Sequence, residues 1–207
     1  MGSEMCIRDR NSTENYYSEI MKNDLTEGRM AFEKQLDIMC AGAFSVSNDS
    51  DLKWVYFLDG LKDGDNNIAA LIRCNDMLRQ TFADSEHYQN YSVIMKNELI
   101  FRKSGMVVGD KFFYDNYCTY QNTDFETWRK QSFEADTWQL FPLEEIDTGE
   151  ETLQAMTFSY PVRNYIQQEQ EANAVVQFLL SKENLEQMFG QLLSRQGGCL
   201  LYTSDAA

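Results

Sequence analysis

The apolar positions of the first part of the chain repeat at the spacing of a helix. Between Thr13 and Ser45 they recur mostly every three or four residues, and no proline interrupts them. They are Met21, Leu25, Phe32, Leu36, Met39 and Ala43. This spacing predicts one helix with a single apolar face, roughly 45 Å long at 1.5 Å per residue. Such a helix serves either as a core helix or as a stalk that also pairs with a second copy of the chain.

Two further helical segments follow the long helix. The polar break from Ser45 to Asp51 offers N-cap side chains to a short segment from Leu52 to Leu61. After a turn at Lys62 to Asn66, helical spacing returns between Asn67 and Phe82. We therefore expect the chain to be helical up to Phe82.

The pattern changes to that of strands beyond Phe82. Tyr91 to Met95 and Leu99 to Arg102 are β-prone runs separated by Lys96, Asn97 and Glu98, which predicts a hairpin. Three more strands are expected at Trp138 to Phe141, Leu153 to Val162 and Asn173 to Leu180. The connections favour an antiparallel sheet, since no strand-helix-strand alternation persists.

Two helices are expected among and after these strands. Thr123-Asp-Phe-Glu126 has the pattern of a capping box and opens a helix to about Ala135. Ser181 is expected to cap a closing helix from Lys182 to Arg195. The predicted fold class is α+β, with a long N-terminal helix and a five-stranded antiparallel sheet flanked by helices.

The amino-acid composition argues against some classes of function. The formal charge is -15, from 33 acidic and 18 basic residues, and the basic residues are not clustered. A nucleic-acid interface needs clustered Lys and Arg, so we expect none here. No window approaches the ~20 apolar residues that span a bilayer, and Met1 to Arg10 lacks the apolar core of an export signal. The fragment itself is expected to be soluble.

Both ends of the chain differ in character from its body. Residues 1–10 and 199–207 continue neither a helix nor a strand pattern, and they resemble translated sequencing-adapter tails. We therefore expect a single native domain over residues 11–198. Its stalk helix would cover residues 11–45 and its exit helix residues 182–195.

Catalytic and metal chemistry find little support in the residues present. The five cysteines are scattered without a CxxC pair, and His87 is the one histidine. Cys40 and Cys74 are therefore expected to be small buried hydrophobes, with no zinc site and no disulfide framework. The sequence has no GxSxG nucleophile motif, and Gly105 to Gly109 lacks the lysine of a phosphate loop. We expect no catalytic residue, metal or cofactor.

Several segments together resemble a known sensor family. They are the hairpin from Tyr91 to Phe101, the aromatic segment Phe112 to Tyr117, Thr123 to Trp128, and Asn173 to Phe189. They resemble the extracellular Cache (PAS-like) sensor region of AraC-type transmembrane regulators and sensor histidine kinases of Firmicutes. The resemblance implies a ligand pocket between the sheet and the segment from Phe112 to Ala135. It also implies flanking transmembrane helices and a cytoplasmic DNA-binding or kinase part.

The aromatic residues of the covering segment fit either a core or a pocket wall. Aromatic side chains bury large areas, while Tyr and Trp also carry a polar edge that suits a mainly apolar ligand site. For a pocket, the expected wall residues are Tyr114, Tyr117, Trp128 and Tyr160, with Arg129 or Arg163 as the charged anchor.

The leading hypothesis is an extracytoplasmic sensor of a membrane-bound bacterial regulator. It would bind an unknown small molecule, form a homodimer through the long N-terminal helix, and pass the signal to the membrane through adjacent terminal helices. The alternative is a secreted or surface-anchored binding protein without signalling output. A third hypothesis, a cytosolic hydrolase, requires a pocket built around His87.

Overall fold

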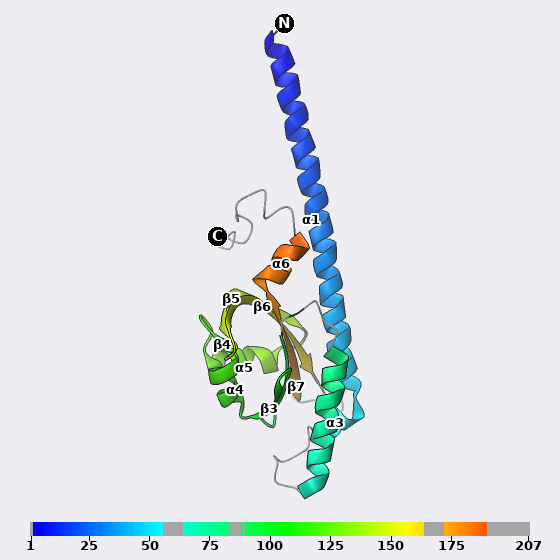
Figure 1. Ribbon diagram of the computed structural model, residues 1–207, viewed down its shortest axis with the longest axis vertical. Coiled ribbons are helices and arrows are strands. Elements are labelled where there is room, and N and C mark those ends of the chain that lie inside the picture. The colour runs from blue at the N-terminus through cyan, green and yellow to red at the C-terminus, as the bar shows by residue number, and fades with distance from the viewer. Residues whose placement is uncertain (1, 56–63, 83–87, 89, 164–171, 190–207) are drawn as a thin grey trace. The chain divides into compact units, whose positions relative to one another are not determined.

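The computed structural model describes residues 2–55, 64–82, 88, 90–163 and 172–189 (Figure 1). The chain divides into two compact units. The first combines residues 1–36 with residues 183–207, and the second comprises residues 37–182.

The N-terminal helix is longer than the sequence pattern predicts. Helix α1 spans Gly2–Asn48, α2 spans Ser50–Val55 and α3 spans Gly64–Phe82. Residues 2–10 were expected to continue no helix pattern, but they belong to α1, and no proline interrupts the helix there. The predicted polar break shrinks to Asp49, whose Oδ1 accepts from the Leu52 N–H (2.8 Å) and so provides the expected capping of the next helix.

In the first unit, the closing helix packs on α1. Helix α6 begins at Lys182 and its described part ends at Phe189, while residues 190–195 of the predicted helix lie outside the described residues. The rings of Phe32 and Phe189 lie 6.4 Å apart between centroids. A Cβ at Gly28 would overlap the Phe189 ring. The two terminal helices are therefore in contact within the first unit.

The second unit is built on one antiparallel sheet of seven strands in the order β3-β2-β1-β7-β6-β5-β4. The strands are β1 Asn90–Met95, β2 Leu99–Arg102, β3 Gly105–Val108, β4 Thr119–Tyr120, β5 Gln139–Asp147, β6 Thr152–Val162 and β7 Ala174–Ser181. Helices α4 (Asp110–Tyr117) and α5 (Phe125–Glu134) connect β3, β4 and β5. The α+β class and the antiparallel pairing are confirmed, while the expected number of five strands is wrong.

The two additional strands and α4 lie where the sequence predicts only a turn and an aromatic segment. β3 pairs with β2 through a tight turn that ends at Gly105, whose φ of 137° favours glycine. β4 has two residues, too few for a period to emerge. Helix α4 is rich in Asp, Asn and aromatic residues, which have modest helix propensity. Burial of Phe113 and Tyr114 accompanies its helical conformation.

Helix α5 begins with a different cap from the one predicted. Its N-cap is Asp124, whose carboxylate accepts from the Thr127 N–H (2.7 Å). Thr123 instead donates through Oγ1 to Glu144 Oε1 (3.2 Å). The capping box is therefore wrong by one residue, because Asp competes directly with Thr for the N-cap position.

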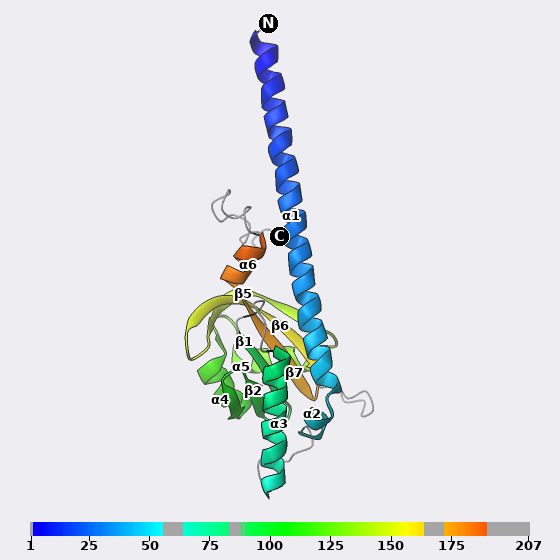
Figure 2. The same cartoon turned by 45° about the vertical axis from the view of Figure 1, so that its right-hand side comes forward.

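Helices cover both faces of the sheet (Figures 1 and 2). On one face, the outer face, Phe178 of β7 packs against Phe82 of α3, with 5.2 Å between ring centroids. Gly42 of α1 lies at the same place, where a Cβ would come within 2.9 Å of the Phe82 ring. The opposite face, the inner face, is covered by α4 and α5, whose Trp128 and Phe133 are 1% exposed. Both faces of β7 are consequently buried.

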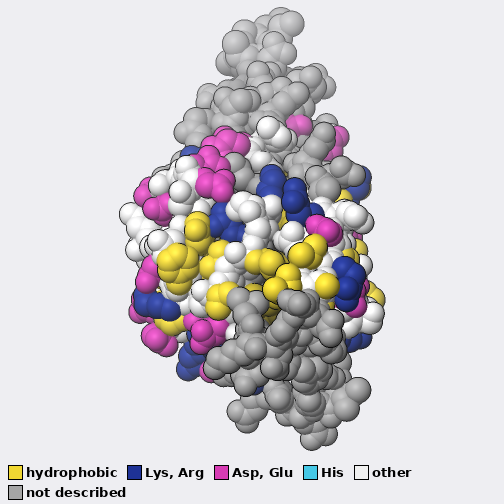
Figure 3. Space-filling model, turned by 60° about the horizontal axis from the view of Figure 1, so that its bottom comes forward, with side chains coloured by type: hydrophobic (Ala, Val, Ile, Leu, Met, Phe, Trp, Pro, Cys, Tyr) yellow, Lys and Arg dark blue, Asp and Glu magenta, His cyan; other side chains and the backbone are white. Residues whose placement is uncertain are grey.

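The surface mixes both charges with apolar side chains. On the face shown in Figure 3, Asp and Glu side chains lie among Lys and Arg side chains. Of the two cysteines expected to be buried, Cys74 is buried, whereas Cys40 is half-buried because it lies beside the apolar face of α1. Within the described part of the chain, no helix combines the length and the apolar character needed to cross a membrane.

Two glycines with positive φ give a matched test of the hairpins. At Gly149 (φ 75°) a Cβ would overlap the carbonyl oxygen of Asn116, whereas at Gly105 (φ 137°) no atom lies within 4 Å. We expect Gly149→Ala to destabilise the protein by about 3 kcal/mol or more, since backbone strain and a clash add. Gly105→Ala should cost about 1 to 2 kcal/mol from strain alone. Urea denaturation of both variants measures the two losses of stability. Equal losses would contradict the expected order.

Candidate functional site

A row of polar side chains crosses the inner face of the sheet. Arg102, Ser92, Gln177, Ser159 and Gln139 belong to β2, β1, β7, β6 and β5, and each is the Cα partner of the next. Side chains of directly paired residues project from the same face of a sheet. The row therefore runs through a face that is otherwise built from apolar residues, here called the polar row.

The apolar residues around the polar row hold α4 and α5 in place. Ile94 and Ile100 of the sheet join Phe113, Tyr114 and Trp128 of the two helices in one buried cluster. Tyr114 and Trp128 pack with 5.3 Å between ring centroids. Aromatic packing of this kind positions α5 directly over the central strands.

Hydrogen bonds tie the covering segment to the polar side chains below it. Gln177 Nε2 donates to Ser132 Oγ of α5 (2.9 Å). The hydroxyls of Tyr120 and Thr157 lie 2.9 Å apart and share a hydrogen bond. These bonds fix the register of α5 and β4 on the sheet, because each links a buried group that needs a partner.

Two cavities adjoin the end of the polar row at β1 and β2. The smaller one, lined mostly by buried residues and for that reason called the enclosed cavity, has a volume of about 20 Å³, and its walls include Ser92, Arg102, Tyr117 and Gln177. The second is a depression of about 320 Å³ whose walls include Lys103 and Glu150. Asn90 lines both cavities, so they are neighbours.

Arg102 is a buried cation at the boundary of the two cavities. Its side chain is 7% exposed, and its Nη2 lies 2.9 Å from Oε1 of Glu150, whose side chain is 67% exposed. The guanidinium carbon lies 3.9 Å from the centroid of the Tyr117 ring. A planar guanidinium stacks well on an aromatic face and keeps its in-plane donors for an anion. The arrangement presents one desolvated positive charge to the cavities.

Three buried polar atoms on this side of the sheet have no hydrogen-bond partner among the described residues. They are Gln177 Oε1, Ser159 Oγ and Trp128 Nε1. Leaving a buried polar group unpaired costs about 1 to 3 kcal/mol, so native proteins rarely accumulate such groups away from a site that binds something polar. Because these atoms lie between α5 and the central strands, we treat this region as the candidate site.

Burial keeps the other ionisable groups of the region neutral. Desolvation raises the pKa of the Cys118 thiol to about 12 and raises the pKa of Tyr120 well above its usual value. Desolvation also raises the pKa of Tyr114. These side chains therefore offer hydrogen bonds but no charge at neutral pH, and neither the thiol nor the phenols are activated for nucleophilic chemistry.

The structure brings part of the predicted site residues together. Tyr117 lines the enclosed cavity. Tyr114 and Trp128 lie in the adjoining buried cluster, and the Tyr114 hydroxyl donates to the Thr123 carbonyl oxygen. Gly109 to Ala135 covers the sheet much as the resemblance implies, with Phe112 itself exposed on α4.

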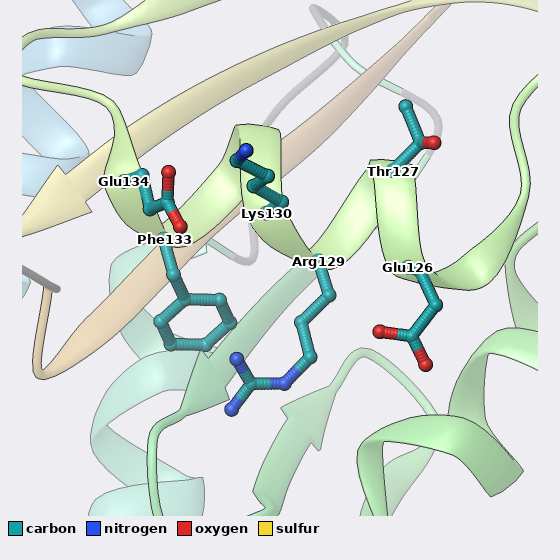
Figure 4. A pocket seen from close by; sticks show the side chains of 6 residues that line it. All are labelled: Glu126, Thr127, Arg129, Lys130, Phe133 and Glu134. Atoms are coloured by element: carbon teal, nitrogen blue, oxygen red, sulfur yellow. The ribbon is translucent and has the colours of Figure 1, made fainter.

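Arg129 lies on another side of α5. Its Nε donates to Asp110 Oδ2 (2.5 Å), and its guanidinium lies 4.8 Å from the centre of the Phe133 ring. Arg129 and Phe133 point to the same side of the helix (Figure 4) and line a separate cavity of about 360 Å³. Arg129 follows Trp128 directly, and a step of one residue turns a side chain by about 100° around a helix.

Tyr160 and Arg163 are also placed away from the polar row. Tyr160 is the Cα partner of Val176, one residue out of phase with Ser159 and Gln177, so its side chain projects from the outer face. Arg163 follows the end of β6 and donates through Nη2 to the Ala135 carbonyl oxygen (2.6 Å). His87, the residue on which the hydrolase hypothesis depends, lies outside the described residues.

Sequence reasoning missed Arg102, Ser92, Gln177 and Ser159. One signal was visible, because Gln177 interrupts the apolar run from Ala174 to Leu180. A polar residue inside a strand that is otherwise apolar points to a buried polar contact. Among the residues described, no three His, Cys, Asp or Glu side chains gather in a way that could hold a metal ion.

Comparison with solved structures finds similar folds, among them two sensory domains. The periplasmic sensory domain of the Campylobacter jejuni chemoreceptor Tlp1 superimposes with a TM-score of 0.54 at 11% identity, over 91% of this chain and 66% of that one. The extracellular domain of vpHK1S-Z8, a protein assigned as a histidine kinase, gives a TM-score of 0.51 at 12% identity, over 87% of this chain and 62% of that one. The chain has the fold of these sensory domains. It spans less than two thirds of the length of either.

The sequence itself adds no closer relative. No protein-family model and no curated protein matches the chain. At 11% and 12% identity the two similarities show the fold, and the chemistry of the site has to be argued from the residues of this chain.

The cap of α5 gives a pH-dependent test of the covering segment. Hydrogen bonds from the backbone and side chain of Thr127 lower the pKa of Asp124 below its ordinary value of 3.8. The ionised cap therefore contributes its full stability above pH 3.8 and loses it as the pH falls through the lowered pKa. We expect Asp124→Ala to be less stable than the unmodified protein at neutral pH, with a difference that narrows in acid.

Urea denaturation across the acid range measures this difference. Asp124→Asn is the control, because the amide oxygen still accepts from the Thr127 N–H but does not titrate. An Ala variant whose deficit stayed constant down to the acid limit of folding would contradict the assignment of Asp124 as a titrating cap.

Proposed function

We propose that this chain is the extracytoplasmic ligand-sensing domain of a membrane-bound bacterial signal-transduction or transcription regulator, of the Cache (PAS-like) type. The observation that carries the proposal is the set of unpaired buried polar atoms, Gln177 Oε1, Ser159 Oγ and Trp128 Nε1. They lie in a fold shared with a chemoreceptor sensory domain and a histidine kinase extracellular domain. A sensor needs a mostly apolar site with a few polar groups, and these three atoms lie among the apolar residues of the sheet and α5.

The ligand in this proposal is a small molecule held between the sheet and the covering helices. In this proposal Gln177 and Ser159 contribute polar groups from the sheet, Trp128 contributes one from α5, and Arg102 with Tyr117 lies at the β1 and β2 end. No step of bond making is required of these residues. The domain acts by binding and not by catalysis.

The signal in this proposal leaves through the terminal helices. The contact of Phe189 with Gly28 and Phe32 supports it, because two helices that touch can pass a small displacement to flanking membrane segments as a pair. Dimerisation through α1 and an output part of the DNA-binding AraC type or the kinase type belong to the same proposal. The membrane-bound location is likewise proposed for the intact protein.

A secreted or surface-anchored binding protein without signalling output is the second candidate function. The net charge of -15 suits a free binding protein as well as a tethered one. The two candidates differ in one respect: a sensor must change its terminal helices when ligand binds, whereas a carrier need not.

Hydrogen exchange combined with a ligand screen tests the proposed function. A library of small metabolites is first screened for compounds that raise the melting temperature of the full chain. A compound found in this way should slow amide exchange in α5 and β7, and a sensor should also show altered exchange between Gly28 and Phe32 and between Glu183 and Phe189. Altered exchange confined to the sheet and α5 would favour the carrier.

A cavity-filling variant provides the specificity control. Ser92 is 8% exposed on the inner face and lines the enclosed cavity, so Ser92→Leu should block ligand-induced stabilisation. Thr152→Leu, at an exposed position of β6, should leave it unchanged. A compound that stabilises the Ser92→Leu protein as strongly as the unmodified one binds elsewhere and contradicts the proposed site.

A further inference from the structure

The ion pair between Arg102 and Glu150 joins one lining residue from each of the two neighbouring cavities. Arg102 lines the enclosed cavity and Glu150 lines the surface depression. We propose that Arg102 is the anchor for a small organic carboxylate, and that Glu150 is a built-in competitor whose carboxylate occupies the ligand's position until it is displaced. This inference rests on the proposed function and names the ligand class and the regulation of that site.

The two partners of this ion pair are unequal. The Arg102 side chain is 7% exposed and the Glu150 side chain is 67% exposed. The arginine is held by its burial and by the Tyr117 ring, whereas the glutamate reaches it from solvent. An exposed carboxylate loses little when it returns to water, but a buried guanidinium left without an anion is costly. Arg102 therefore requires an anion, and Glu150 is the replaceable member of the pair.

The other arginines around the covering segment are differently placed. Arg129 pairs with Asp110, whose side chain is 12% exposed, and both are packed beside α5. Arg163 donates to the Ala135 carbonyl oxygen at the end of β6. Neither faces the enclosed cavity. Arg102 is the guanidinium that combines burial, a cavity and an exposed partner.

The residues near Arg102 favour a carboxylate with a short apolar part. The guanidinium offers coplanar N–H donors that match a carboxylate, and a carboxylate is the group that it already binds. The Ser92 hydroxyl and the Gln177 amide line the same cavity and supply neutral hydrogen bonds. The Tyr117 ring provides an apolar wall for carbon atoms.

The volumes of the two cavities explain why Glu150 has to be displaced before a ligand reaches Arg102. A cavity of about 20 Å³ has room for about one water molecule. The depression of about 320 Å³ has the size of a small-molecule site, which starts near 300 Å³. When Glu150 turns outward, the two spaces meet at Arg102, and a ligand can place its carboxylate on the arginine and its remainder in the depression.

The turn that carries Glu150 is itself well fixed. Thr148 N–H donates to the Glu151 carbonyl oxygen (2.9 Å), and Gly149 N–H donates to Asp147 Oδ1 (2.8 Å). Gly149 packs so closely on Asn116 at the end of α4 that it leaves no room for a Cβ. The displacement is therefore a rotation of the Glu150 side chain on a fixed backbone, and this turn adjoins the segment that supplies Tyr117.

A pair of matched acid-to-amide variants tests the competitor. Glu150→Gln removes the carboxylate that contacts Arg102, whereas Glu145→Gln removes the same charge from an exposed position of β5 that is one residue out of phase with the inner face. Propionate is the probe, because it is the side chain of Glu150 as a free molecule. Its neutral counterpart propionamide and inorganic phosphate are the comparison ligands.

Calorimetric titration of the full chain should give a clear ranking. Propionate should bind the Glu150→Gln protein about three to ten times more tightly than the unmodified protein, since the competing state is removed. The Glu145→Gln protein should match the unmodified one, and Arg102→Gln should lose propionate binding. Because Arg102→Gln removes a buried group, its fold is checked by circular dichroism, and Arg102→Lys is the alternative if it fails to fold.

The possible outcomes separate this inference from the function that it rests on. Equal affinity of propionate for Glu150→Gln and the unmodified protein, or equal binding of propionate and propionamide, overturns the role of the pair. Phosphate binding as strong as propionate binding overturns the carboxylate class. If neutral metabolites bind and Ser92→Leu blocks their binding, the result supports the proposed sensory function and contradicts the role of Arg102 as a carboxylate anchor.

Discussion

The burial of β7 on both faces is the constraint on which the rest of the second unit depends. Phe178 packs outward on Phe82, and the next residue toward the N-terminus, Gln177, points inward to Ser132 of α5. A strand between two helical layers has no solvent-facing side on which to place a polar group. Gln177 therefore needs a partner inside the protein, and its hydrogen bond to Ser132 ties α5 to the strand.

The sequence predicts the elements of this core better than it predicts the site. The hairpin, β6 and β7 were visible as short apolar runs, because burial of a strand selects apolar side chains, and α5 was visible from the helix-start pattern at Thr123 to Glu126. β3, β4 and α4 were not predicted. β4 has two residues, and α4 is built from residues with weak helix preference. Their conformation is decided by contacts with the rest of the chain.

The site depends on register, which a single sequence does not contain. Arg102 and Gln177 belong to one polar row because β1 pairs with β2 on one side and with β7 on the other. A shift of one residue would turn either side chain to the outer face. The same parity explains Tyr160, which has the expected chemistry but belongs to the other face of β6. Tyr117 lies beside the polar row because α4 places its ring against Arg102.

The course of β7 connects the proposed binding site to the terminal helices. Its inward residues meet α5, its outward Phe178 meets Phe82 near Gly42 of α1, and the strand ends at Ser181, directly before α6 begins. A ligand that satisfies Gln177 acts on a strand whose backbone continues into one terminal helix and whose opposite face touches the other. Because a close-packed interior adjusts in discrete steps and not continuously, a small change at Gln177 has few ways to be absorbed locally. In the proposed sensor, Phe178 is the contact through which a shift of β7 reaches Gly42 of α1, and Ser181 is the residue at which the strand passes into α6.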